Sequence, residues 1–257
     1  MTENTLKQVS RASRDLNLAA SHCLEYFQDY VVSMAAAGNA LPVATDATTN
    51  VVTTPKTVLY ATNIETQTLL APVSAATGLE IGGDQTNGDG FEINLQNPGN
   101  TDGKFLFTVG TEPVGFFIEG QFTVADVSGA AELLIGFRKN EAFAKARATY
   151  TDYALIGLTG ADIKIATDLN NAGEVLTDTT ENAADAGTFT FRVEVTSDGK
   201  VSYQVANSST DTLGTPTVSK DFTFDSTDVL VPVIRFMHGA DVAGSVVMNY
   251  LKCGYLN

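Results

Sequence analysis

The chain has two parts that differ in the spacing of their hydrophobic residues. Over residues 1–38, apolar or small side chains recur three and four positions apart, which is the spacing of one face of an amphipathic helix. Gly38 ends this pattern, and Pro42 cannot continue a helix. We therefore predict an N-terminal helical arm, whose apolar stripe packs either on its own domain or on another subunit. The positions of the stripe, which we expect to bind a partner, are Leu6, Val9, Leu16, Ala20, Cys23, Phe27, Tyr30 and Met34.

The period changes to two after a short intermediate segment. Residues 39–58 are rich in alanine, threonine, valine and asparagine, which predicts an extended linker. The clearest strand signal is the alternation over 189–195, which a turn at 197–200 joins to a second alternating run over 201–205. Because that turn contains Asp-Gly, the two runs predict a β-hairpin.

Further strand candidates follow one another with almost no helical pattern between them, which favours antiparallel pairing in two packed sheets. We therefore predict an all-β, antiparallel two-sheet jelly-roll sandwich over residues 59–257. The further strand candidates are residues 91–95, 104–109, 115–124, 131–138, 154–158, 162–167, 218–224, 229–237 and 245–255.

The charge excludes one class of partner. The net charge is −15, and residues 1–60 hold four basic and five acidic side chains, so that −14 of it lies in 61–257. Such a surface repels phosphate, so we expect neither nucleic acid nor an anionic membrane as a partner. The N-terminus lacks a basic region and no apolar run reaches about 18 residues, so we expect no secretion signal and no membrane span.

Candidate catalytic groups are sparse. The two histidines, His22 and His238, have no serine or cysteine in a recognisable nucleophile motif, and His238 is expected in a turn. Glycoside hydrolysis needs a pair of carboxylates, but strand 115–124 offers Glu119 alone, and the strand over 189–195 offers only Glu194. We therefore predict that the protein is not an enzyme.

No cofactor or metal is expected either. Residues 84–90 gather several oxygen-bearing side chains, but their spacing does not match a calcium loop and is explained by a turn. Cys23 and Cys253 lie near opposite ends of the chain and are expected to be buried thiols. The chain has no tryptophan, and the candidate residues for stacking on a sugar are tyrosines 150, 153 and 203, which also fit core positions.

Several segments together resemble the concanavalin-like jelly-roll family. They are residues 115–122 and 133–137, the hairpin over 189–205, and the run Val231-Pro232-Val233-Ile234 that leads into a long last strand over 248–255. The layout of arm, linker and acidic sandwich is also similar to the capsid decoration (cement) proteins of tailed bacteriophages. That second resemblance implies a structural virion protein, made in the host cytoplasm, whose arm binds the major capsid protein and stabilises the head. Copies of the protein would also associate with one another. The alternative is a carbohydrate-binding, lectin-like adhesin or fibre module that binds a glycan.

Overall fold

The computed structural model describes residues 43–45, 49–53, 58–64, 73–75, 78–81, 87–95, 105–208, 213, 221–239 and 246–256 of the chain. The predicted helical arm over 1–38 lies outside these residues, as do its partner-binding stripe and His22. The same holds for residues 84–86 of the candidate calcium loop. The predictions for these parts of the chain remain predictions.

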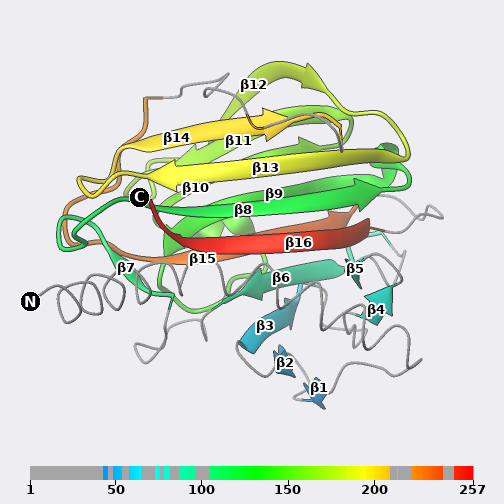
Figure 1. Ribbon diagram of the computed structural model, residues 1–257, viewed down its shortest axis with the longest axis horizontal. Helices are drawn as coiled ribbons and strands as arrows, with labels where there is room; N and C mark the ends of the chain where they lie inside the picture. The colour runs from blue at the N-terminus through cyan, green and yellow to red at the C-terminus, as the bar shows by residue number, and fades with distance from the viewer. Residues whose placement is uncertain are drawn as a thin grey trace, which may run out of the picture.

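Within the described residues the chain forms two antiparallel sheets that lie face to face (Figure 1). The larger sheet has the strand order β1-β2-β3-β6-β15-β9-β10-β11-β12, with β7 paired to β15, and the smaller sheet has the order β14-β13-β8-β16-β5-β4. Two short 3-10 helices, Val127–Gly129 and Arg147–Thr149, lie in connections between strands. The strands are β1 (Val43–Thr45), β2 (Thr49–Thr53), β3 (Val58–Asn63), β4 (Val73–Ala75), β5 (Gly78–Glu80), β6 (Gly90–Asn94), β7 (Phe107–Thr108), β8 (Phe116–Val124), β9 (Ala130–Lys139), β10 (Tyr153–Thr159), β11 (Asp162–Asp168), β12 (Val175–Asn182), β13 (Gly187–Val195), β14 (Val201–Ala206), β15 (Val229–His238) and β16 (Val246–Tyr255).

The predicted all-β, two-sheet architecture is confirmed, and so is its clearest local feature, the hairpin. β13 pairs with β14 so that Val195 stands opposite Val201. Gly199 lies in the connecting turn with φ +91°, a conformation that suits glycine.

The structure also differs from the predicted strands. Of the strand predicted over 218–224, residues 221–224 form only an isolated bridge between Thr223 and Lys200. β12 was not predicted, because this edge strand is mostly exposed and polar and shows little apolar alternation. The range predicted as a linker contains β1 and β2, which pair in order onto β3 and extend the larger sheet.

The alternation of each strand divides the larger sheet into an inner and an outer face. On β9, Leu133, Ile135 and Phe137 point into the core between the sheets. Aromatic rings pack in the same core: Phe107 stacks on Phe116 with ring centroids 4.4 Å apart, and both rings pack edge-on against Phe137. The side chains that alternate with these core residues along each strand point outward, away from the core. On the central strands these outward positions carry charged residues, although they are buried.

Candidate functional site

A row of buried charges lies on the outer face of the larger sheet. Arg235 on β15 stands directly opposite Glu92 on β6, so both side chains point to the same face. Nη1 of Arg235 donates to Glu92 Oε2 at 2.8 Å, and Nη2 of Arg138 donates to Glu92 Oε1 at 2.9 Å. Glu92 and Arg138 are 0% exposed and Arg235 is 2% exposed. Buried charges are tolerated only when they are paired in this way.

The pairing keeps Glu92 ionised. Burial raises the pKa of this carboxyl, but the positive charges of Arg138 and Arg235 outweigh burial. Hydrogen bonds from Asn94 and Tyr150 act in the same direction, so the pKa of Glu92 lies below its ordinary value.

The same charges hold a connecting segment over the sheet. Residues 140–152, which we call the strap, join β9 to β10 across the outer face. Arg235 donates from Nη1 to the carbonyl of Ala144 at 3.2 Å and from Nη2 to the carbonyl of Lys145 at 2.8 Å. Tyr150, which lies within the strap, donates from Oη to Glu92 Oε2 on β6 at 2.7 Å. The strap is thus attached to the sheet by hydrogen bonds from buried side chains.

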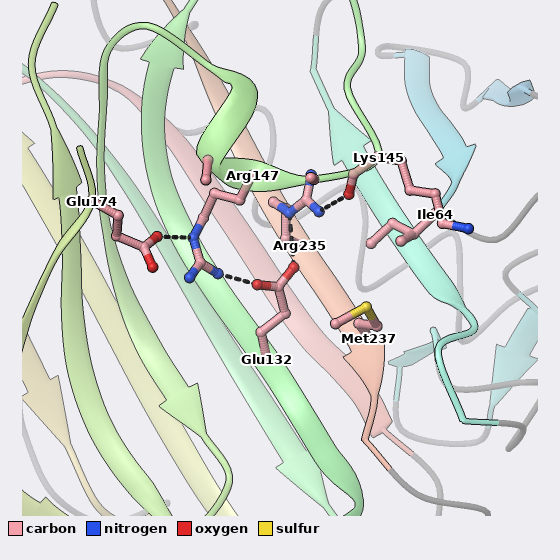
Figure 2. A pocket seen from close by; sticks show the side chains of 9 residues that line it. Ile64, Glu132, Lys145, Arg147, Glu174, Arg235 and Met237 are labelled. Carbon is pink, nitrogen blue, oxygen red and sulfur yellow. Dashed lines mark hydrogen bonds and ion pairs between the residues drawn. The ribbon is translucent and has the colours of Figure 1, made fainter. Parts of the chain in front are cut away.

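Strap and sheet together border a pocket of about 490 Å³ (Figure 2). This volume falls in the range of small-molecule sites, which is roughly 300–1,000 Å³. Figure 2 shows Glu174 and Arg147 at one end of the pocket, Ile64 and Lys145 at the other, and Arg235 between them. The pocket is lined by Ile64, Glu132, Lys145, Ala146, Arg147, Ala148, Glu174, Arg235 and Met237.

Arg147 bridges two carboxylates at the polar end of the pocket. Its Nε donates to Glu174 Oε2 at 2.6 Å, and its Nη1 donates to Oε2 of Glu132. Tyr153 Oη also donates to Glu174 Oε2, at 2.7 Å. Both hydrogen bonds to Glu174 end on its Oε2, and Arg147 donates through its Nε and Nη1. Among the described residues, no group forms a hydrogen bond with Glu174 Oε1 or with Arg147 Nη2. An acceptor and a donor are therefore left for a ligand, on side chains that are 22% and 13% exposed.

The ionisation of this end favours binding over acid catalysis. Burial raises the pKa of Glu174, but the hydrogen bonds from Arg147 and Tyr153 outweigh it, so that the pKa lies below its ordinary value. A general acid of a glycosidase needs a raised pKa. Glu174 is therefore suited to accept a hydrogen bond rather than to protonate a leaving group. The expectation that the chain is not an enzyme stays a prediction.

The tyrosines proposed for stacking on a sugar are not available for that role, and this corrects the sequence interpretation. Tyr150 is 1% exposed, and Tyr153 and Tyr203 are 0% exposed. Tyr203 belongs to the core between the sheets, whereas Tyr150 and Tyr153 pack on the outer face. The apolar surface of the pocket comes instead from the partly exposed Met237 and the exposed Ala146 and Ala148, whereas Ile64 is 1% exposed.

The two carboxylates considered for hydrolysis lie on the smaller sheet, away from the pocket. Arg192 joins them, since its Nη1 donates to Glu119 Oε2 at 2.8 Å and its Nε donates to Glu194 Oε1 at 2.6 Å. Lys252 pairs with Glu119 at 2.9 Å. Burial raises the pKa of Glu119, but the hydrogen bonds from Lys252 and Arg192 and the charge of Lys252 lower it by more. The pKa of Glu119 therefore lies below its ordinary value, and this carboxyl also stays ionised. The arrangement is an ion-pair cluster on a sheet face.

The remaining candidates contribute no second site. His238, expected in a turn, is instead the buried last residue of β15, and Cys253 is buried, as predicted. Among the described residues no group of three or more histidine, cysteine or acidic side chains could hold a metal ion. In the same part of the chain, no helix has the length and hydropathy that a membrane span requires.

The residues of the buried charge row and of the pocket were not identified from the sequence, although the sequence pattern around two of the charged residues was informative. Glu92 stands between Phe91 and Ile93, and Arg235 stands between Ile234 and Phe236. Each is therefore a charged residue inside an apolar strand. Such a charge needs a buried partner of opposite sign. Arg147 and Glu174 carried no such signal, because both lie in connections between strands.

The comparisons with known proteins define the class of fold. No protein-family model matches the chain, and no curated protein matches it. The exoplasmic/lumenal domain of VIP36 in its Ca²⁺-bound form is similar with a TM-score of 0.51 at 9% identity, over 77% of this chain and 84% of that chain. The same domain bound to Ca²⁺ and Man3GlcNAc gives a TM-score of 0.50 at 8% identity, over 77% and 83%. The carbohydrate-binding module CBM66 from Bacillus subtilis gives 0.43 at 13% identity, over 76% and 94%.

The likeness to the VIP36 domain shows a concanavalin-like jelly-roll sandwich, as the sequence predicted. The resemblance to phage decoration proteins stays a prediction.

The charged face and the smaller sheet both predict a dependence of stability on pH. The pKa values of Glu92, Glu119 and Glu174 are lowered by folding from an ordinary value of 4.5. A carboxyl of this kind stabilises the fold above its unfolded pKa, and the contribution is lost as the pH falls through the folded pKa. We expect the free energy of unfolding in urea to be constant near neutrality and to decrease from about pH 5 downward. Equal stability at neutral pH and well below pH 4 would contradict this expectation.

Proposed function

We propose that the protein is a carbohydrate-binding module of lectin type, whose pocket on the outer face of the larger sheet holds one saccharide unit. The observation that carries the proposal is the pairing of an open donor and an open acceptor at one end of the pocket with aliphatic walls. The donor is Nη2 of Arg147 and the acceptor is Oε1 of Glu174. The walls include Met237, Ala146 and Ala148, which are partly exposed or exposed. Saccharides present hydroxyls that donate and accept hydrogen bonds, and they also present apolar C–H faces.

The rigidity of the polar end supports the proposal. Arg147 is held between Glu132 and Glu174, and Glu174 is held in addition by Tyr153. Polar groups that are ordered before the ligand arrives lose little conformational entropy on binding. Further support comes from the fold, because the VIP36 domain, which is similar, has been seen bound to Man3GlcNAc.

Screening the full chain against an immobilised glycan panel tests the proposal. We expect saturable binding to at least one saccharide class, competed by the same saccharide free in solution. If no glycan of a broad panel bound above background, the proposal would be wrong.

The capsid interpretation stays a prediction beside this proposal. Binding of the arm to a major capsid protein, association of copies and a location on the virion surface all depend on residues 1–38, which the structure does not describe. The described part of the chain supports the carbohydrate-binding alternative more directly, because the pocket belongs to it.

A further inference from the structure

The charges around the pocket balance one another. Three arginines face three glutamates: Glu92 pairs with Arg138 and Arg235, Glu132 pairs with Arg235 and Arg147, and Glu174 pairs with Arg147. Every guanidinium is therefore already neutralised by at least one carboxylate. Lys145 lies at the opposite end of the pocket beside Ile64 (Figure 2) and already has an interaction partner. The polar end thus has no surplus positive charge to offer a ligand.

The two atoms without a hydrogen bond at the polar end, Glu174 Oε1 and Arg147 Nη2, require different kinds of ligand group. Glu174 Oε1 can only accept, so it needs a ligand group that donates. Nη2 of Arg147 can only donate, so it needs a ligand group that accepts. Two adjacent hydroxyls meet both needs, because one hydroxyl donates while its neighbour accepts. An ionised carboxylate can only accept hydrogen bonds, so it could bind Arg147 Nη2 but not Glu174 Oε1.

A ligand carboxylate would also meet repulsion here. To reach Arg147 it would have to lie beside Glu132 and Glu174, which both already bind the same guanidinium. Their ion-paired side chains are only 8% and 22% exposed, so water screens the repulsion weakly. Like charges brought together in this way cost several kcal/mol in protein complexes, which is enough to determine specificity.

We propose that the pocket selects neutral saccharides through two adjacent hydroxyls bound by Glu174 and Arg147, and disfavours a saccharide ring that carries a carboxylate. A C–H face of the same ring then lies toward Met237. This inference rests on the proposed carbohydrate-binding function and names the ligand class of that site.

The test compares matched pairs of ligands. The methyl glycosides of glucose, galactose and mannose are titrated into the full chain together with the corresponding methyl uronides, which differ by one carboxylate. We expect at least one neutral glycoside to bind about tenfold more tightly than its uronide. We also expect its Kd to stay constant between roughly 50 mM and roughly 500 mM salt, because no net charge is neutralised on binding.

A substitution in the pocket should change this preference. Glu174→Gln removes the negative charge and the full acceptor strength of Oε1. We expect it to weaken binding of the neutral glycoside about tenfold and to reduce or reverse the preference over the uronide. Glu181→Gln is the matched control on β12, because Glu181 bonds Asn207 and does not line the pocket, and it should leave both affinities unchanged.

The outcomes separate the two proposals. Tighter binding of the uronide by the unmodified chain, or an unchanged preference in Glu174→Gln, would overturn the neutral-diol inference and leave the carbohydrate-binding function in place. Binding of neither kind of ligand, nor of any glycan of a broad panel, would overturn the function itself and the inference with it.

Discussion

Replacing Glu92 with glutamine is expected to lower the free energy of unfolding by about 3–5 kcal/mol. The carboxylate is 0% exposed and accepts hydrogen bonds from Arg138, Arg235, Asn94 and Tyr150. Glutamine has nearly the same shape, but it leaves two buried guanidinium groups short of a counter-charge. Breaking a buried ion pair by removing one partner is costly for that reason. Urea unfolding at neutral pH measures the effect.

The control for this variant is Glu181→Gln, at a partly exposed position on β12. Its expected change is within about 0.5 kcal/mol, as is usual for substitutions at the surface. If Glu92→Gln unfolded at the same urea concentration as the unmodified protein, the buried charge row would not be what holds the outer face together. The pH dependence of stability should also become weaker in Glu92→Gln, because the lowered carboxyl pKa of Glu92 no longer contributes to it.

Replacing Arg147 with alanine is expected to weaken saccharide binding by about 10- to 100-fold, because a hydrogen bond from a charged group contributes about 1.5–3 kcal/mol. The substitution removes the donor Nη2 and also releases Glu174, which Arg147 holds through its Nε. Affinity for the best saccharide of the glycan panel, measured by calorimetric titration, is the quantity to compare.

Arg192→Ala is a closely matched control for this second prediction. Arg192 bridges Glu119 and Glu194 on the outer face of the smaller sheet much as Arg147 bridges Glu132 and Glu174 on the larger one. Both variants therefore break two ion pairs, but only one of them changes the pocket. Equal losses of affinity in the two variants would indicate a general effect on stability and would contradict a role for Arg147 in binding.

The fold was predictable from the sequence because its core strands alternate cleanly. The hairpin over 189–205, for example, has apolar residues at every second position and a turn that needs glycine at position 199. The edge strand β12 was not predictable in the same way. β12 is exposed along most of its length, so burial imposes no alternation on it.

The site was less predictable than the fold, because it is assembled from residues far apart in the chain. Glu92 and Arg235 are 143 positions apart and become neighbours only through the pairing of β6 with β15. Arg147 reaches Glu132 and Glu174 only because the strap crosses the outer face, which no local pattern indicates. The tyrosines, in contrast, suggested a binding role by residue type alone, and burial excludes it for all three.

The most direct test of the account is a crystal structure of the full chain with the tightest saccharide of the glycan panel. The account predicts one sugar ring in the pocket, with a hydroxyl donating to Glu174 Oε1, its neighbour accepting from Arg147 Nη2, and a C–H face toward Met237. A saccharide bound elsewhere, at the loop tips or on the smaller sheet around Arg192, with the pocket free of sugar, would contradict it.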